Sequence, residues 1–155
     1  MRFPIYTIGY ERASVPEFLS ALSAAGIQVV VDVRAIAHSR RPGFAKTALK
    51  THLQLAGITY WHIPSLGNPK AGRMAAWSGD EAGFHAIFLA HLTSAEPMKA
   101  LQDLALRASD VRVCLLCMEA EPERCHRSLV ADALHSSQGL SIEHLFPAAV
   151  HAGAG

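Results

Sequence analysis

The chain has 155 residues, half of them hydrophobic, and its 14 Lys and Arg residues against 13 Asp and Glu residues give a formal net charge of +1. This length suits one domain with a well-formed core. The near-neutral charge excludes the strongly basic balance of a general nucleic-acid binder. Affinity for an anion must therefore be local, and nucleic acid stays an allowed partner that the net charge does not indicate.

Strand and helix patterns alternate along the chain. Short apolar runs predict strands at residues 5–8, 29–34, 58–63, 111–119 and 141–146. Helical patterns lie between them: one begins at a capping box, Ser14 to Glu17, and the others cover about 45–55, 84–92, 98–105 and 124–134. Residues 64–80, rich in Gly and Pro, predict a long functional or mobile loop.

This alternation predicts the fold class and the domain organisation. We expect a single α/β domain over residues 1–150, with a mainly parallel sheet of about five strands and helices on both faces. The small-residue segment 151–155 is expected to be a flexible tail.

Apolar content and cysteine number indicate the compartment. No apolar run approaches the roughly 20 residues of a membrane-spanning helix, and Met1 to Pro4 do not resemble the start of a signal peptide. Three cysteines, an odd number, argue against a secreted disulfide framework. We therefore expect a cytoplasmic protein without a membrane partner. These features do not predict its oligomeric state.

The most informative stretch is the fourth predicted strand and the start of the helix after it. Cys117 and Glu119 lie at the carboxyl end of the strand, and Cys125, His126 and Arg127 begin the helix. Ligands bind at this edge in open α/β sheets. Amide donors at a helix start favour a thiolate at Cys125. Cys117, Glu119, Cys125 and His126 are therefore the candidate catalytic residues, and a structural role is the alternative for either cysteine.

The cysteine spacing raises two other interpretations. Cys114 and Cys117 have the C-x-x-C spacing of redox pairs, but residues three apart on a strand point to opposite faces, so these thiols cannot meet. Cys114 is then a buried small hydrophobe. Cys117, Glu119, Cys125 and His126 match no familiar zinc spacing. The sequence therefore predicts neither a metal nor a cofactor.

A second polar cluster follows the second predicted strand. Arg34 ends that strand, and Ser39 and Arg40 lie in the loop after it. With Arg127, these side chains are candidates to bind an anion at the same edge of the sheet, because a guanidinium donates in a planar fork. Tyr10, after the first strand, is a further candidate for the pocket wall. The alternatives are a solvated loop for Arg40 and, for Arg127, a buried partner of Asp32 or Glu119.

Glu119 and the corner of Cys125, His126 and Arg127 are expected to form one bonded unit, because the turn between them is short. A partly desolvated carboxylate needs donors, and the nearest are the free amides of the first helical turn and the guanidinium of Arg127. In this arrangement Glu119 would orient Arg127.

The same segments carry a resemblance to a known family. The chain resembles family 488 of the domains of unknown function in its Thr7–Tyr10, Val31–Arg34 and Gly57–Tyr60 segments and, most specifically, in Cys-x-Glu at 117–119 followed by Cys-His-Arg at 125–127. It departs from the family's pattern at Tyr10, where histidine is usual, and at Asn68, where a further glycine is common. The resemblance implies a fold and a site, and it implies no reaction.

A weaker similarity is to rhodanese-like domains, which also place Asp-x-Arg after a buried strand and a cysteine between a later strand and a helix. The acidic residues after Cys117, at positions 119, 121 and 123, disfavour a thiolate there. A simple rhodanese mechanism at Cys117 is therefore not expected.

Two functional hypotheses follow. In the first, the protein is an enzyme that holds a phosphate-bearing, nucleotide-like ligand and uses Cys117 or Cys125 as a nucleophile, with Glu119 or His126 moving protons. In the second, the same crevice is a non-catalytic module that binds a nucleotide or a nucleic-acid end, and the cysteines are structural. The sequence does not choose between them.

Overall fold

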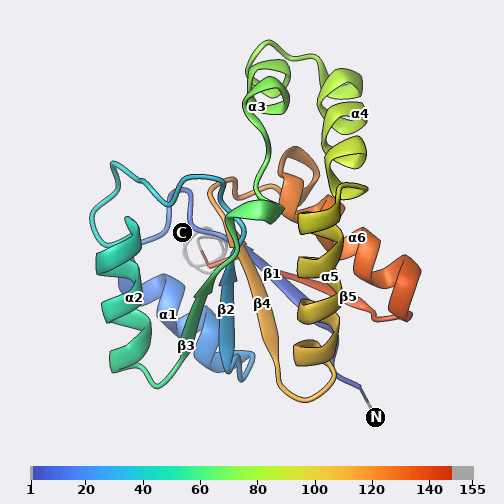
Figure 1. Cartoon of the computed structure of the whole chain (residues 1–155). Coiled ribbons are helices and arrows are strands. Elements are labelled where there is room, and N and C mark those ends of the chain that lie inside the picture. The colour runs from blue at the N-terminus through green and yellow to red at the C-terminus, as the bar shows by residue number, and fades with distance from the viewer. Residues whose placement is uncertain (1, 148–155) are drawn as a thin grey trace.

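The computed structural model describes residues 2–147, which form one α/β domain around a central sheet (Figure 1). All strand pairs in the sheet are parallel, and the strand order is β3-β2-β4-β1-β5. The strands are β1 Ile5–Gly9, β2 Val29–Asp32, β3 Thr59–His62, β4 Val113–Cys117 and β5 Ile142–Leu145. The predicted fold class is confirmed. The predicted flexible tail, 151–155, lies outside the described residues.

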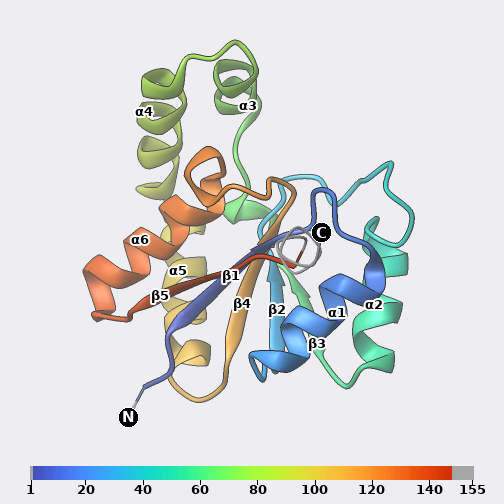
Figure 2. The same ribbon diagram turned by 180° about the vertical axis from the view of Figure 1, so that it is seen from behind.

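Helices cover both faces of the sheet (Figure 2). On one face α1 (Val15–Ala24) and α2 (Lys46–Leu55) pack over a core that includes Phe18, Leu49 and Cys114. On the other face α5 (Ala95–Ala108) and α6 (His126–Gln138) cover a second core, which includes Leu115 and Cys117. The central strand β4 is fully buried because it has a helical layer on each side.

The segment predicted as a long irregular loop is largely helical. It contains the 3₁₀ turn Pro64–Leu66 (η1) and the helix α3 (Lys70–Trp77), so the loop prediction for residues 64–80 is wrong. Gly72 obscured the helical pattern. A Cβ there would lie 2.0 Å from Asn68 Oδ1, so the glycine makes room for a side chain tucked under the helix. Helix α3 pairs with α4 (Glu81–Leu92), and together they project beyond the carboxyl edge of the sheet (Figure 1).

The turn between β4 and α6 contains a second 3₁₀ element, η2 (Pro122–Arg124). Cys125 follows it in an extended conformation, and α6 begins at His126 rather than at Arg124 as the sequence pattern indicated. This turn returns the chain to the carboxyl edge of the sheet within a few residues.

Within residues 2–147, none of the helices combines the length and the apolar character that crossing a membrane would require.

Candidate functional site

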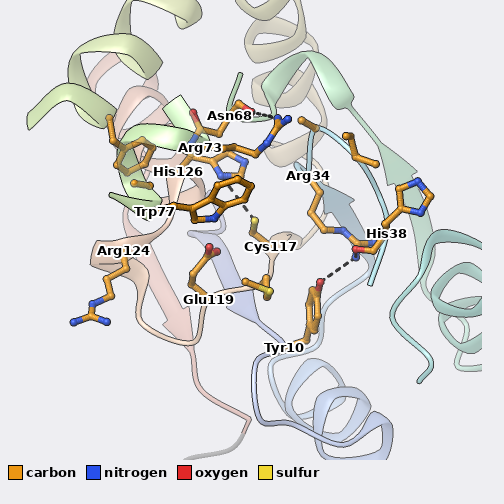
Figure 3. A pocket seen from close by; sticks show the side chains of 15 residues that line it. Tyr10, Arg34, His38, Asn68, Arg73, Trp77, Cys117, Glu119, Arg124 and His126 are labelled. Atoms are coloured by element: carbon orange, nitrogen blue, oxygen red, sulfur yellow. Dashed lines mark hydrogen bonds between the residues drawn. The ribbon is translucent and has the colours of Figure 1, made fainter. Parts of the chain in front are cut away.

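A cavity of about 390 Å³ lies at the carboxyl edge of the sheet, below the α3–α4 pair (Figure 3). Side chains from the ends of the strands form one wall, and α3 and the start of α4 form the other. The lining residues are Tyr10, Arg34, Ala35, Ile36, His38, Asn68, Arg73, Ala76, Trp77, Phe84, Cys117, Met118, Glu119, Arg124 and His126. Ligands of parallel α/β sheets bind at this edge.

Two thiols and an imidazole meet beside the cavity. The Sγ atoms of Cys117 and Cys125 and a ring nitrogen of His126 all lie within 4.8 Å of one another, and each residue is buried. Cys117 Sγ is 3.8 Å from His126 Nδ1. The other ring nitrogen, Nε2, is 2.6 Å from the main-chain oxygen of Val33, so it carries a proton and donates to this carbonyl. Nδ1 is therefore the atom that His126 presents to the thiols.

The two thiols differ in acidity. The hydrogen bond to Cys125, followed by burial, raises the pKa of Cys117 above its usual range. Burial would also raise the pKa of Cys125, but hydrogen bonds from Cys117 and His126 and the charge of Arg127 outweigh it and lower that pKa. Burial likewise opposes charge on His126, yet its contact with Cys125 raises the imidazole pKa. Cys125 is therefore the more acidic thiol of the pair.

The cause of the low pKa differs from the one expected from sequence. Cys125 occupies the N-cap position of α6, but its side chain accepts no hydrogen bond from the first turn of the helix. Its sulfur instead turns toward Cys117 and His126. Cys125 is also 3% exposed and does not line the cavity, whereas Cys117 and His126 do.

The Glu119 side chain enters the cavity from the turn after β4 (Figure 3). Its Oε2 atom is buried and has no hydrogen-bond partner among residues 2–147. Burial, followed by the negative charge of Cys125, raises the pKa of Glu119 to about 7. A carboxyl group with this pKa gives up and takes back a proton readily near neutral pH.

The expectation that the Glu119 carboxylate pairs with Arg127 is wrong. Arg127 is fully buried, and its guanidinium donates to the main-chain oxygens of Glu119 and Ala120 instead. The close approach depends on Gly9 at the end of β1, because a Cβ there would lie 1.8 Å from the Glu119 carbonyl oxygen. Strand end and helix start are joined as predicted, but through the main chain.

Arg34 likewise uses its guanidinium for hydrogen bonds within the fold. Its Nε and Nη2 atoms donate to the two carboxylate oxygens of Asp32, at 2.9 and 2.7 Å, and both side chains are almost fully buried. Nη1 donates to the Phe44 carbonyl at 2.8 Å and to the Tyr10 hydroxyl at 3.2 Å. Burial alone would lower the pKa of Arg34, but Asp32 raises it above its usual range. Arg34 anchors the 35–44 loop through hydrogen bonds within the fold, although its side chain also borders the cavity.

The structure separates the candidate site residues into two groups. Cys117, Glu119, His126, Tyr10 and Arg34 line the cavity. Those that do not line it are Cys125, Ser39, Arg40 and Arg127.

The physical reasons are different for each residue that lies outside. Arg40 is exposed in the loop, and the Ser39 hydroxyl accepts a hydrogen bond from the amide of Arg41. Arg127 diverges from His126 by about a quarter turn of helix and lies under the β4–α6 turn. The predicted shared anion clamp of Arg34, Arg40 and Arg127 is therefore not present.

Other cations take their place around the cavity. Arg73 comes from α3 and Arg124 from η2, and neither was predicted. Arg73 donates to the Asn68 carbonyl at 2.7 Å, while the buried Oδ1 of Asn68 has no hydrogen-bond partner within the described chain. Trp77 lines the same wall and is 79% exposed. Recognising α3 as a helix would have grouped Arg73 and Trp77, which lie four apart and so share one face.

The comparisons with known proteins agree with the sequence motifs. No curated protein and no solved structure matches the chain. A family model described as "Domain of unknown function DUF488" matches residues 14–134. This match covers most of the domain, from the start of α1 to the middle of α6, and includes the whole β4–α6 turn. The chain therefore belongs to the family described as Domain of unknown function DUF488.

Proposed function

We propose that the protein is an enzyme that binds a small phosphate-bearing molecule with a flat ring, such as a nucleotide, in this cavity. The reacting groups are the cluster of Cys117, Glu119, Cys125 and His126. One observation carries the proposal: ionisable groups suited to chemistry share one cavity with cations and with an exposed aromatic ring.

The residues that line the cavity support the proposed ligand class. Arg73 and Arg124 border the cavity and bring positive charge to it, with Arg124 Nε also 3.4 Å from Glu121 Oε2, and Trp77 offers an aromatic face. An exposed tryptophan beside arginines is well suited to a ligand that has both a ring and a negative charge. The volume, about 390 Å³, falls in the range of small-molecule sites.

The polar groups supply the chemistry. The buried Glu119 carboxyl, with its pKa near 7, suits proton transfer to or from a bound ligand. Glu119 lines the same cavity as Cys117 and His126, which supports proton transfer close to the thiol–imidazole cluster. The cluster lies at the cavity wall, so a ligand held by Arg73 and Arg124 would meet it directly.

A thermal-shift screen tests the proposal. The protein is heated with inorganic phosphate, sulfate or each of a set of nucleoside monophosphates. A ligand at about 100 times its Kd should stabilise the fold by roughly 2.7 kcal/mol. The stabilisation should be smaller in Arg124→Ala and unchanged in Arg40→Ala, whose side chain lies outside the cavity. Equal stabilisation in all three proteins, or none with any of these anions, would refute the proposed ligand class.

A non-catalytic binding module would behave differently in a second step. Once a stabilising nucleotide is known, its conversion is followed by chromatography with wild-type protein and with Glu119→Gln. An enzyme should convert it, and the variant should be slower by roughly 100-fold or more, the usual contribution of a proton-transfer group. Binding without conversion would leave the cavity as a binding site only.

A further inference from the structure

We propose that Cys117, Cys125 and His126 form a binding site for one zinc ion, with a fourth coordination position open toward the cavity. The inference deepens the proposed function because it names a metal ion, zinc, that the cluster would bind. It rests on that function only for the role of the open position.

The donor set suits zinc. Two thiolates and one imidazole nitrogen are ligands that zinc prefers, and oxygen-seeking ions such as magnesium and calcium bind such a set poorly. Three protein ligands with a fourth position for water or substrate are the pattern of catalytic zinc sites, whereas structural sites are closed by four protein ligands. No fourth His, Cys, Asp or Glu atom belongs to this cluster in the part of the chain that the structure describes.

The separations between the donor atoms are close to those of a tetrahedral site. Zinc–sulfur and zinc–nitrogen bonds of about 2.3 and 2.0 Å at tetrahedral angles place sulfur and nitrogen roughly 3.6 Å apart and two sulfurs roughly 3.8 Å apart. The observed Cys117 Sγ to His126 Nδ1 separation is 3.8 Å, and no pair among the three donor atoms exceeds 4.8 Å. The widest pair must contract by roughly 1.2 Å at most, which side-chain rotation can supply.

The orientation of His126 is the second, independent observation. A histidine that binds a metal nearly always donates its other ring N–H to a carbonyl or carboxylate, which fixes the ring and its tautomer. His126 Nε2 makes this bond to the Val33 carbonyl at 2.6 Å, across the gap between α6 and the end of β2. Nδ1 therefore faces the sulfurs before any ion binds, and it becomes a metal ligand once it is deprotonated.

The burial of the three ligands indicates the direction in which the fourth coordination position of the ion points. Cys125 lies on the protein side and is 3% exposed, while Cys117 and His126 line the cavity. The fourth position therefore faces the cavity, where Glu119 carries its unpartnered Oε2 atom. Glu119 stands two residues after the first ligand and beside the open position, so its Oε2 atom would face a water or a ligand bound there. A bound water lowered in pKa by zinc is a hydrolytic nucleophile.

The spacing of these three ligands along the sequence matches no familiar zinc motif, so the sequence alone does not indicate the site. Cys117 lies at the end of a strand, and Cys125 and His126 are adjacent residues at a helix start, separated from it by the η2 turn. Neighbouring residues are unusual as joint ligands. They can serve here because Cys125 is in an extended conformation and His126 is the first helical residue, which lets both side chains turn to the same side.

The test uses the whole chain, prepared in reductant without chelator and then titrated with zinc or cobalt(II). Bound metal is measured by elemental analysis after desalting. We expect one zinc per chain, and a cobalt(II) form with visible bands of tetrahedral geometry and near-ultraviolet thiolate-to-metal bands. Cys117→Ser, Cys125→Ser and His126→Gln should each weaken binding by roughly 100-fold or more, since even loss of an outer-shell partner costs up to that factor.

Cys114→Ala is the matched control. Cys114 lies on the same strand but faces the opposite core, so its variant should bind one zinc with unchanged affinity. Octahedral cobalt spectra without thiolate bands, less than a tenth of an equivalent of zinc in wild type, or full binding in Cys117→Ser would overturn the proposal. The wild-type stoichiometry and spectrum decide the question even where a variant fails to fold.

A zinc titration needs no nucleotide, and the anion screen needs no zinc. A failure of the zinc site with retained anion binding therefore refutes only this inference. Tight zinc binding without any anion binding refutes the proposed ligand class and leaves the metal site standing.

Discussion

Arg127 donates from its guanidinium to the main-chain carbonyl of Glu119, and not to the carboxylate of the same residue. This bond crosses the β4–α6 turn and is completed by a weaker one to the Ala120 carbonyl at 3.4 Å. It holds the turn in place while leaving the Glu119 side chain free to enter the cavity. A buried cation is thus used to position a carboxyl group without neutralising it.

Arg127→Ala should therefore reduce stability and not the intrinsic affinity for a ligand. The change removes hydrogen bonds from a charged donor and leaves two carbonyls without them, which should lower the free energy of unfolding by roughly 3 kcal/mol. Urea unfolding measures the loss, with Arg40→Ala as an exposed control that should change it by less than about 0.5 kcal/mol. Matching midpoints for the two variants would mean that the buried guanidinium does not hold the turn.

The Asp32–Arg34 pair should be the main anchor of the 35–44 loop. Asp32 also accepts a hydrogen bond from the Tyr60 hydroxyl at 2.6 Å, and burial together with this bond raises the pKa of Tyr60 above its usual range. Asp32→Asn leaves a buried guanidinium without its counter-charge and should cost about 3–5 kcal/mol. Tyr60→Phe removes a single hydrogen bond and should cost about 1–3 kcal/mol.

Limited proteolysis provides a local measurement for the same pair. Trypsin should cleave after the exposed Arg40 faster in Asp32→Asn than in Tyr60→Phe, because only the first variant frees Arg34 from the sheet edge. Cleavage at equal rates in both variants would show that the loop does not depend on the ion pair.

The stability of the fold should fall on the acid side of neutrality through His144. Burial, followed by the positive charge of Arg127, lowers the pKa of this imidazole, and Asp132 and Glu123 oppose the shift in part. The neutral ring lies 2.6 Å from the Thr7 hydroxyl. A histidine with a lowered folded-state pKa contributes stability above its unfolded pKa of about 6.5, and this contribution is lost as the pH falls through the folded pKa.

His144→Gln keeps a polar side chain but cannot titrate. Its free energy of unfolding should therefore fall less between pH 7.5 and pH 5.5 than that of the wild type. Chemical denaturation at the two pH values measures the difference. If the free energy of unfolding of the variant falls as much as that of the wild type, or more, the loss of stability in acid comes from other groups.

Glu119→Gln should leave the fold nearly unchanged and strengthen anion binding. The Oε2 atom makes no hydrogen bond within residues 2–147, so little is lost when the carboxyl becomes an amide. The variant also removes a partial negative charge from the cavity wall, and inorganic phosphate should bind more tightly by a few-fold. Isothermal titration calorimetry checks this. Weaker binding in the variant would mean that Glu119 orients a cation, the role that the sequence suggested for it.

The sequence predicts the layers of the fold well because apolar runs and helical stripes record burial directly. The five strands, the two cysteine faces of β4 and the divergence of His126 from Arg127 all follow from the period of a strand or a helix. The same reasoning predicts that residues of the β4–α6 turn lie at the cavity, since the carboxyl edge of a parallel sheet gathers strand ends and helix starts.

The partners of the charged groups could not be predicted in the same way. Arg34, Arg40 and Arg127 were grouped by charge, but the sequence does not show that Arg34 bonds to Asp32, two residues away, or that Arg127 bonds to carbonyls. The cavity wall formed by α3 was missed because Gly67, Pro69 and Gly72 resemble a loop. Their role becomes visible only in three dimensions, where Gly72 accommodates the Asn68 side chain.

The central claim, a nucleotide-sized anion bound in the cavity beside Trp77, is tested most directly by the fluorescence of that residue. The chain has two tryptophans, and Trp61 lies away from the cavity beside Arg107, so Trp61→Phe isolates the signal of Trp77. Titration of this protein with the nucleoside monophosphate that stabilises it best should quench the fluorescence saturably. Arg124→Ala in the same background should raise the Kd by roughly tenfold, a loss of about 1.4 kcal/mol, and Arg40→Ala should not change it. A linear, unsaturated response that is the same in all three proteins would contradict a ligand site in this cavity.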